Sequence, residues 1–287
     1  MKSISLVIGE TASLPQEIIK KNEMVFVPYV IDWRDGEDLP GENIFQKMRE
    51  AEKRGIKTLP KTSQPSPWTF KKIFEETLKS SEKVLCITLS AGLSGGYNSA
   101  LQARRMLKED EGKRIHIVDC ENVSAGEGLF DLKAMDLINE EKEIEGIMKE
   151  LKEFIPKVHL FGMLEDPKWL EAGGRMNHTL ASLVRQMQKI GMRPLIGIKD
   201  GVVKSVALRM QAKDIPTALL KELENETKGK KVKVAIVHAD NLKDAERLRE
   251  MIQEKMPNTE IAFLNLLDSV IGVHVGPGTL ICAWHEI

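Results

Sequence analysis

Two hydroxyl-rich segments of this sequence could bind a small anion. Segment 61–67 reads Lys-Thr-Ser-Gln-Pro-Ser-Pro, and segment 90–96 reads Ser-Ala-Gly-Leu-Ser-Gly-Gly. Each is predicted to open a helix, so its hydroxyl groups would lie beside the backbone N–H groups left free at a helix N-terminus. Such a cradle suits a carboxylate or a phosphate. Because neither segment carries an evident base, metal ligand or phosphate-reading lysine, we expect the site to hold an anion rather than to transform it.

The composition argues against a polyanion or a metal ion as the partner. The 287 residues carry a net charge of −1, which provides no global attraction to nucleic acid or to an anionic membrane. The six histidines lack the spacing of metal ligands, so no metal site is predicted. Cys86, Cys120 and Cys282 are far apart and odd in number, which is typical of buried thiols in a cytoplasmic protein. No segment is apolar for long enough to form a signal-peptide core or a transmembrane span.

A serine hydrolase is an alternative reading of the second segment. Gly-Leu-Ser-Gly-Gly at 92–96 fits the pattern Gly-x-Ser-x-Gly, with Ser94 as the nucleophile. Asp240 or Asp268, followed by His274, would complete the order Ser, Asp, His. However, the nucleophilic serine of this motif normally follows its strand at once, whereas Ser94 lies several residues beyond the strand predicted to end at residue 89. The same loops could also serve a binder of small phosphorylated ligands.

Strands and helices alternate along the first half of the chain. This pattern predicts a parallel sheet flanked by helices, with the site at the carboxyl ends of its strands. Ser13 is a candidate cap for a helix that begins at Pro15, and Ser66 is a candidate cap for the helix that begins at Pro67. The predicted strands are 4–8, 24–31, 83–89 and 114–119, and the main predicted helices are 42–54, 67–78, 97–109, 124–138 and 144–155.

The pattern restarts after residue 156. Asp200-Gly201 between two apolar runs indicates a β-hairpin, and a hairpin among alternating units predicts a mixed sheet. The predicted strands are 159–163, 194–198, 202–208, 232–238, 261–266 and 279–284, with a helix from residue 242. We therefore expect an α/β protein of two domains. Residues 1–157 would form an N-terminal three-layer α/β/α domain around the parallel sheet, and residues 158–287 a C-terminal mixed-sheet domain.

Six short strings resemble the DegV family of bacterial fatty-acid-binding proteins, in the family order and at near-family spacing. They are Lys-Thr-Ser-Gln-Pro-Ser at 61–66, Ser-Ala-Gly-Leu-Ser-Gly-Gly-Tyr-Asn-Ser-Ala at 90–100, Ile-Val-Asp at 117–119, Gly-Gly-Arg-Met at 173–176, Arg-Pro-Leu-Ile at 193–196 and Val-Ile-Gly-Val-His-Val-Gly-Pro-Gly at 270–278. The resemblance covers nearly the whole chain. It implies two α/β domains with one long-chain fatty acid buried between them.

The resemblance also implies roles for individual residues. The hydroxyl groups that hold the carboxylate fall on Thr62 and Ser94, and Gly95 belongs to the same binding loop. Arg175 and His274 fall near the head group or support it. No catalytic residue and no cofactor are implied. A cavity lined by Met, Ile and Phe would distinguish such a lipid binder from a hydrolase or a binder of phosphorylated ligands.

The resemblance further implies a protein partner. Arg209 matches a basic position implicated in docking the ATP-binding subunit of a bacterial fatty acid kinase, which phosphorylates the bound acid to an acyl phosphate. This chain would then be the non-catalytic subunit that presents the substrate, and not itself an enzyme. With no transmembrane segment expected, only a transient contact with a membrane is left open.

The sequence departs from the family pattern at the start of the chain and after Gly95. Gly9 and Glu10 occupy the place of the family's Asp-Ser pair, and Gly96 replaces its usual Thr. These changes put into question any supporting role of the missing pair and the range of ligands. Structural readings also stay open: Thr62 could cap a helix, His274 could be a core residue, and the glycines before Arg175 could end a helix.

Overall fold

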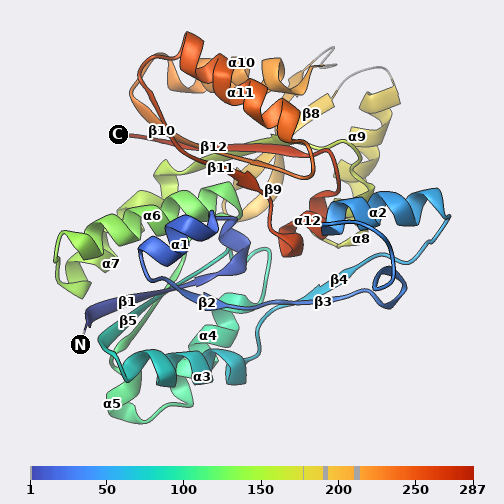
Figure 1. Cartoon of the computed structure of the whole chain (residues 1–287). Helices are drawn as coiled ribbons and strands as arrows, with labels where there is room; N and C mark the ends of the chain where they lie inside the picture. Colours follow the sequence, from blue (N-terminus) through green and yellow to red (C-terminus); the bar gives the residue numbers. More distant parts are fainter. Residues whose placement is uncertain (1, 177, 190–192, 210–213) are drawn as a thin grey trace.

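Two β-sheets separated by a layer of helices make up most of the molecule (Figure 1). The structure is a computed structural model, and it describes residues 2–176, 178–189, 193–209 and 214–287. The N-terminal half supplies a parallel sheet and the C-terminal half a mixed sheet, so the predicted α/β fold class is confirmed. The predicted division into domains at residue 157 stays a prediction.

The N-terminal sheet contains four parallel strands in the order β2-β1-β5-β6. They are β1 (Lys2–Gly9), β2 (Val25–Val27), β5 (Ser81–Thr88) and β6 (Ile115–Asp119). Side chains alternate between the two faces of a strand, and this decides where each packs. On β1, Leu6 and Ile8 belong to the core between the sheets, whereas Val7 belongs to the core on the opposite face.

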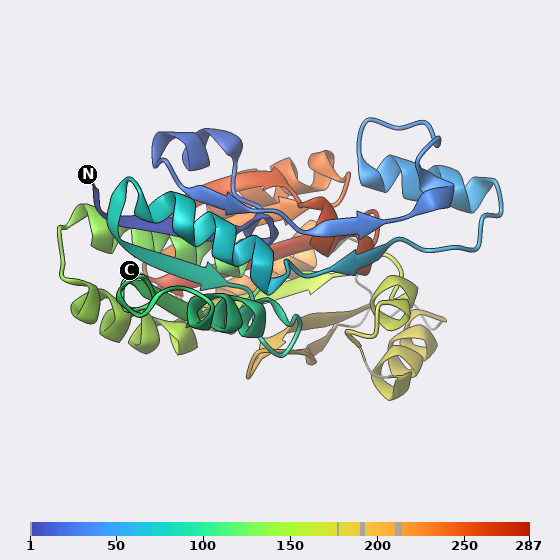
Figure 2. The same ribbon diagram turned by 90° about the horizontal axis from the view of Figure 1, so that it is seen from below.

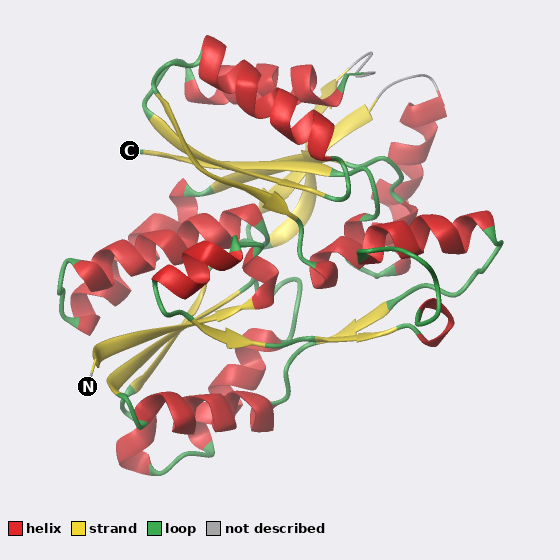
Figure 3. Cartoon of the chain, viewed as in Figure 1, coloured by secondary structure: helices red, strands yellow, loops and turns green. Residues whose placement is uncertain are grey.

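Helices cover both faces of this sheet (Figure 3). On its outer face pack α3 (Pro67–Leu78) and α4 (Gly96–Arg105). On its inner face lies α6 (Ala125–Asn139), which contacts the parallel sheet and also the mixed sheet. This double contact explains why α6 is buried along most of its length instead of only along one stripe. Other helices of this half are α1 (Gln16–Lys21), α5 (Glu109–Gly112) and α7 (Ile144–Phe154), with short 3-10 turns η1 (Glu10–Ala12) and η3 (Ile155–Lys157).

The C-terminal sheet contains six strands in the order β11-β10-β12-β7-β8-β9. Only β10 and β11 are parallel to each other among its paired strands. The helices α10 (Ile215–Thr227) and α11 (Leu242–Lys255) cover its outer face, where a second apolar core lies. The strands are β7 (His159–Met163), β8 (Arg193–Lys199), β9 (Val202–Arg209), β10 (Val232–His238), β11 (Thr259–Leu266) and β12 (Leu280–Glu286).

A third group of elements extends from one side of the two sheets (Figure 2). Its short sheet pairs β3 with β4 in antiparallel fashion, and its helix α12 packs against α2 and α8. These elements bring together segments from the start, middle and end of the chain. They are β3 (Val30–Asp32), η2 (Arg34–Gly36), α2 (Ile44–Lys53), β4 (Lys61–Ser63), α8 (Lys168–Ala172), α9 (His178–Lys189) and α12 (Ser269–Val275).

Three local predictions are wrong. The strand expected at 24–31 is two strands, β2 and β3, separated at Pro28, which has no N–H group to donate to a ladder. Ser13 does not cap α1, because Pro15 occupies the N-cap position and the Ser13 hydroxyl donates to Asp268 Oδ2 at 2.7 Å. The helix expected at 97–109 ends at Arg105, and α5 follows separately.

Candidate functional site

The two hydroxyl-rich segments lie side by side in the fold. Thr62 lies on β4, opposite Ile31 of β3, so part of the first segment is a strand and not a loop. Ser94 precedes α4, and its Oγ accepts a hydrogen bond from the Gly96 N–H at 3.2 Å. A Cβ atom at Gly95 would lie 2.9 Å from Nε2 of Gln64, so the absent side chain lets the two segments approach each other closely.

The second segment is anchored on a turn of the opposite sheet. The predicted hairpin is confirmed, with Gly201 in its turn between β8 and β9 at a φ of +72°. Ser90 Oγ donates to the Gly201 carbonyl at 2.6 Å, and a Cβ atom at Gly92 would lie 2.6 Å from the same oxygen. On its other side, the Ala91 N–H donates to Asp119 Oδ2 at 3.1 Å. The position of Ser94 therefore depends on both sheets.

His274 faces Thr62 across the site. Its Nε2 lies 2.8 Å from Thr62 Oγ1, although the two residues are 212 positions apart in the sequence. His274 lies in α12 and is 8% exposed. Burial, with the positive charge of Arg175 as a smaller cause, lowers the pKa of His274 to about 4. The imidazole is therefore neutral at physiological pH and can exchange a hydrogen bond with the Thr62 hydroxyl.

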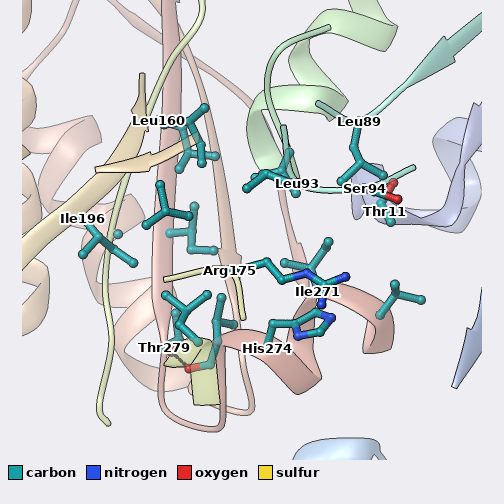
Figure 4. A pocket seen from close by; sticks show the side chains of 18 of the residues that line it. Thr11, Leu89, Leu93, Ser94, Leu160, Arg175, Ile196, Ile271, His274 and Thr279 are labelled. Carbon is teal, nitrogen blue, oxygen red and sulfur yellow. Dashed lines mark hydrogen bonds between the residues drawn. The ribbon is translucent and has the colours of Figure 1, made fainter. Parts of the chain in front are cut away.

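Arg175 lies next to His274, as Figure 4 shows. Gly173 is the C-cap of α8, as one reading of the sequence proposed, and a Cβ atom there would lie 2.3 Å from Nδ1 of His274. Gly174 follows with a φ of +69°, a conformation that glycine adopts without strain. The chain turn places the half-buried Arg175 guanidinium at the wall of the cavity, where its Nη1 donates to the Gly173 carbonyl.

These groups form the polar end of a cavity whose other walls are apolar. The space between its walls is about 810 Å³, including the part open to solvent. Polar side chains gather at one end: Thr11, Tyr29, Thr62, Gln64, Ser94, Arg175 and His274. Aliphatic side chains from both halves of the chain line the rest: Leu89, Leu93, Val123, Leu160, Leu164, Leu170, Ile196, Ile198, Val203, Val270, Ile271, Val275 and Ile281.

The lining differs from the predicted one in composition. We expected Met, Ile and Phe, whereas Leu, Ile and Val line the cavity, together with Gly162, Gly197 and Thr279. Gly95 lies beside the cavity as the N-cap of α4 and is not one of the lining residues. Ser66 caps α3 as predicted, with its Oγ accepting from the Thr69 N–H at 3.1 Å. Arg209 ends β9, but its side chain lies outside the described residues.

The groups of the alternative hydrolase are not assembled. His274 interacts with Thr62 and not with Ser94. Asp268 is the N-cap of α12, accepting from the Ile271 N–H at 2.9 Å, and Asp240 accepts from the Asn43 side-chain amide at 3.1 Å. A serine nucleophile needs a base within hydrogen-bonding distance, and that base needs an orienting partner. The arrangement therefore suits binding by hydroxyl groups and not acyl transfer.

Sequence reasoning missed three residues of the polar end. Gln64 belongs to the recognised string and could have been assigned to the site, and Thr11 was noted only beside the departures at Gly9 and Glu10. Tyr29 gave no signal, because it fell within a predicted strand. Within the described ranges, no three His, Cys, Asp or Glu side chains are placed to hold a metal ion. No helix of the described part has the length and apolarity needed to cross a membrane.

Comparison with known proteins assigns the family. The model described as "Uncharacterised protein, DegV family" matches residues 3–286, so the chain belongs to the DegV family. Protein DegV of Bacillus subtilis is 27% identical over 98% of this chain and 99% of its own length. The solved structure of a fatty-acid-binding DegV family protein from Thermus thermophilus is 25% identical, with a TM-score of 0.85 over 99% of this chain and 100% of that one. The structure of DegV from Bacillus subtilis, described as a fatty acid binding protein, is 26% identical, with a TM-score of 0.81 over 100% of each chain.

Proposed function

We propose that this protein binds one long-chain fatty acid in the cavity between its two sheets. Thr62 and Ser94 would hold the carboxylate, with Gly95 supporting their loop and with Arg175 and His274 beside them. The observation that carries the proposal is the separation within one cavity of a small hydroxyl-rich polar end from long aliphatic walls. The descriptions of the Thermus and Bacillus structures as fatty acid binding support it.

The energetics favour an acyl chain over a small polar ligand. Each buried methylene contributes about 0.8 kcal/mol, so about 15 of them supply roughly 12 kcal/mol. Association costs on the order of 4–15 kcal/mol, so useful affinity requires nearly complete burial of the chain. A sugar phosphate or a bare phosphate would leave the aliphatic walls without a partner. In the described part of the lining, Arg175 is the one cationic side chain, which is little for a dianion.

Native mass spectrometry of the purified protein tests this function. We expect a mass higher than that of the chain by one fatty acid, which denaturing extraction releases for identification. Palmitate added to the delipidated protein should raise the melting temperature. Equal masses before and after delipidation, together with no effect of palmitate, would exclude the proposal.

We further propose that the protein presents the bound carboxylate to the ATP-binding subunit of a bacterial fatty acid kinase in the cytoplasm. The chain itself would be no enzyme and would need no cofactor, because the phosphoryl donor belongs to the partner. The family resemblance supports this role, in which Arg209 would belong to the docking surface. Arg209→Ala should retain the lipid but lose acyl phosphate formation with a cognate kinase. If lipid retention falls as much as turnover, Arg209 belongs to the lipid site instead.

A further inference from the structure

A second hollow adjoins the cavity of the proposed fatty acid site. Leu93, Arg175 and Val203 line both the cavity and this hollow, which we call the outer pocket. Lys204 lines the outer pocket but not the cavity. Among the described residues that line the outer pocket, none is acidic. A ligand in the cavity therefore has a second compartment beside it, and the two side chains with charge in that compartment are both cationic.

Arg175 can serve both compartments at once. Its guanidinium lies beside His274 at the polar end of the cavity (Figure 4), and the same residue lines the outer pocket. A guanidinium has five N–H donors in a planar fork, and the bond from Nη1 to the Gly173 carbonyl engages only one of them. The remaining donors can bind a carboxylate on one side and a phosphate oxygen on the other.

Lys204 is held in a fixed relation to the segment that bears Ser94. It follows the turn of the β8–β9 hairpin, whose Gly201 carbonyl accepts the 2.6 Å hydrogen bond from Ser90 Oγ. A Cβ atom at Gly201 would lie 2.6 Å from that same Oγ, so the turn is closely packed against the segment 90–96. The hairpin therefore positions the Lys204 side chain next to the loop that precedes α4.

The carboxylate of Asp200 leaves Lys204 available to a ligand. Lys204 Nζ donates to Asp200 Oδ2 at 2.5 Å, which orients the ammonium group. The side chains of Lys204 and Asp200 are 44% and 72% exposed, and exposed ion pairs are weak. An ammonium group also has three N–H donors, so this bond leaves two of them for another acceptor.

The outer pocket lies beside the last strand of the mixed sheet. Val203 and Lys204 belong to β9, which ends the strand order and pairs only with β8 among the described strands. Arg209, the proposed docking residue, ends the same strand. A kinase subunit docked at Arg209 would therefore lie along the strand that carries Lys204.

We propose that Lys204 determines specificity for a phosphorylated head group. With Arg175, it would bind the phosphoryl group of an acyl phosphate in the outer pocket, while the acyl chain stays in the cavity. This inference rests on the proposed function and deepens it. A fatty acid carboxylate then needs only the cation in the cavity wall, whereas the product uses the second cation as well.

The chemistry of the proposed transfer explains the need for that second cation. One carboxylate oxygen forms a bond to the γ-phosphorus of ATP, the bond from this phosphorus to the β,γ-bridging oxygen breaks, and ADP leaves with the electron pair. The single negative charge of the carboxylate is thereby replaced by a phosphoryl group with a charge of about −1.5 to −2 at neutral pH. Lys204 supplies positive charge where this negative charge accumulates.

Binding of hexadecyl phosphate tests the inference without a kinase. This monoalkyl phosphate has the chain length of palmitate and lacks the reactive acyl bond. Competition with labelled palmitate in equilibrium dialysis measures its affinity for the delipidated protein. Lys204→Met should weaken hexadecyl phosphate binding by about tenfold, because one charge-assisted contact is lost, and should change palmitate affinity by less than about twofold.

Lys199→Met is the matched control. It removes a cation from the same hairpin, at an exposed residue that lines neither the cavity nor the outer pocket. This variant should bind both ligands like the wild type, and thermal unfolding shows that both variants fold. Equal losses of hexadecyl phosphate affinity in Lys199→Met and Lys204→Met would reflect net charge alone and would overturn the proposal.

A double-mutant cycle tests whether Lys204 itself meets the phosphate. Asp200 has a φ of +53°, a conformation that asparagine tolerates, so Asp200→Asn should preserve the turn. By releasing Lys204 from its carboxylate partner, Asp200→Asn should raise hexadecyl phosphate affinity by about threefold. The same substitution in the Lys204→Met background should have no such effect. An equal rise in both backgrounds would overturn the direct contact.

The outcomes separate this inference from the proposed function. If the wild type binds palmitate but not hexadecyl phosphate, the outer pocket is not a phosphate site and the proposed function stands. If Lys204→Met weakens both ligands equally, or neither, Lys204 does not determine the head group and the inference is wrong. If the wild type binds neither ligand, the proposed function itself fails.

Discussion

The two ends of the cavity are built in different ways. At the polar end, the side chains come from loops, helix ends and short strands, and they are already hydrogen-bonded to the protein, as Thr62 is to His274. At the apolar end, many of the side chains come from the long strands of the mixed sheet, such as Leu160 on β7 and Ile281 on β12. Hydrogen bonds need defined directions, whereas aliphatic contacts do not. Under the proposed function, the polar end would therefore orient the ligand and the apolar end would supply most of its affinity.

The largest effect is expected from a charge in the apolar wall. Ile198→Glu places a carboxylate among the aliphatic side chains of β8 and should lower palmitate affinity by at least about a thousandfold, because an acyl chain cannot solvate a charge. Lys199→Glu introduces the same carboxylate at the next residue, which is exposed, and should leave the affinity nearly unchanged. Equilibrium dialysis measures both variants. Similar losses in the two would show that the apolar end does not determine the affinity.

An effect of intermediate size is expected for His274 in the lipid-free protein. Its pKa of about 4 lies below the ordinary 6.5, so the unfolded chain binds a proton more readily than the folded one between these values. Folding stability is therefore lost as the pH falls from about 6.5 to about 4, by about 3 kcal/mol in total. His274→Gln should lack this loss in urea unfolding at pH 7 and pH 4. An unchanged difference between the two pH values would mean that His274 is solvated in the folded state.

The smallest effects are expected from substitutions of two serines, one with a proposed role in binding and the other with a role in stability. Ser94→Ala should weaken palmitate binding by about tenfold with little change in stability, since it removes one charge-assisted hydrogen bond. Ser66→Ala should lower the free energy of unfolding by about 1 kcal/mol, because Ser66 caps α3, and should leave palmitate affinity unchanged. Calorimetry of unfolding and of binding distinguishes the two. A fluorophosphonate probe should not label Ser94. Covalent labelling of Ser94 would support the alternative function, a serine hydrolase.

Local patterns predicted most of the elements because their signals are short in range. The cap at Ser66, the turn at Asp200-Gly201 and the apolar stripes of the helices depend on residues within a few positions of one another. The misplaced strand at 24–31 shows the limit of such patterns. Its apolar run continues across Pro28, but the chain there passes from the parallel sheet to the small β3–β4 sheet.

The candidate site was predictable only in part, because local patterns do not show which distant segments of the chain meet. The hydroxyl groups of Thr62 and Ser94 stood out because each lies in a distinctive string. Tyr29 did not, since neither residue type nor spacing marks a tyrosine in an apparent strand as part of a site. Its place in the cavity lining depends on how distant segments of the chain pack together.

The sequence by itself determined the order of strands and helices, the family and the segments that bear hydroxyl groups. These follow from local periodicity, capping and turn chemistry, and from strings read directly along the chain. Only the tertiary structure decided which groups meet: His274 with Thr62, Ser90 with Gly201, and Ser13 with Asp268. Such contacts join residues far apart in the chain, and their energies depend on burial, which no local pattern specifies. The tertiary structure likewise decided that Glu127, an ordinary acidic residue in the sequence, is fully buried.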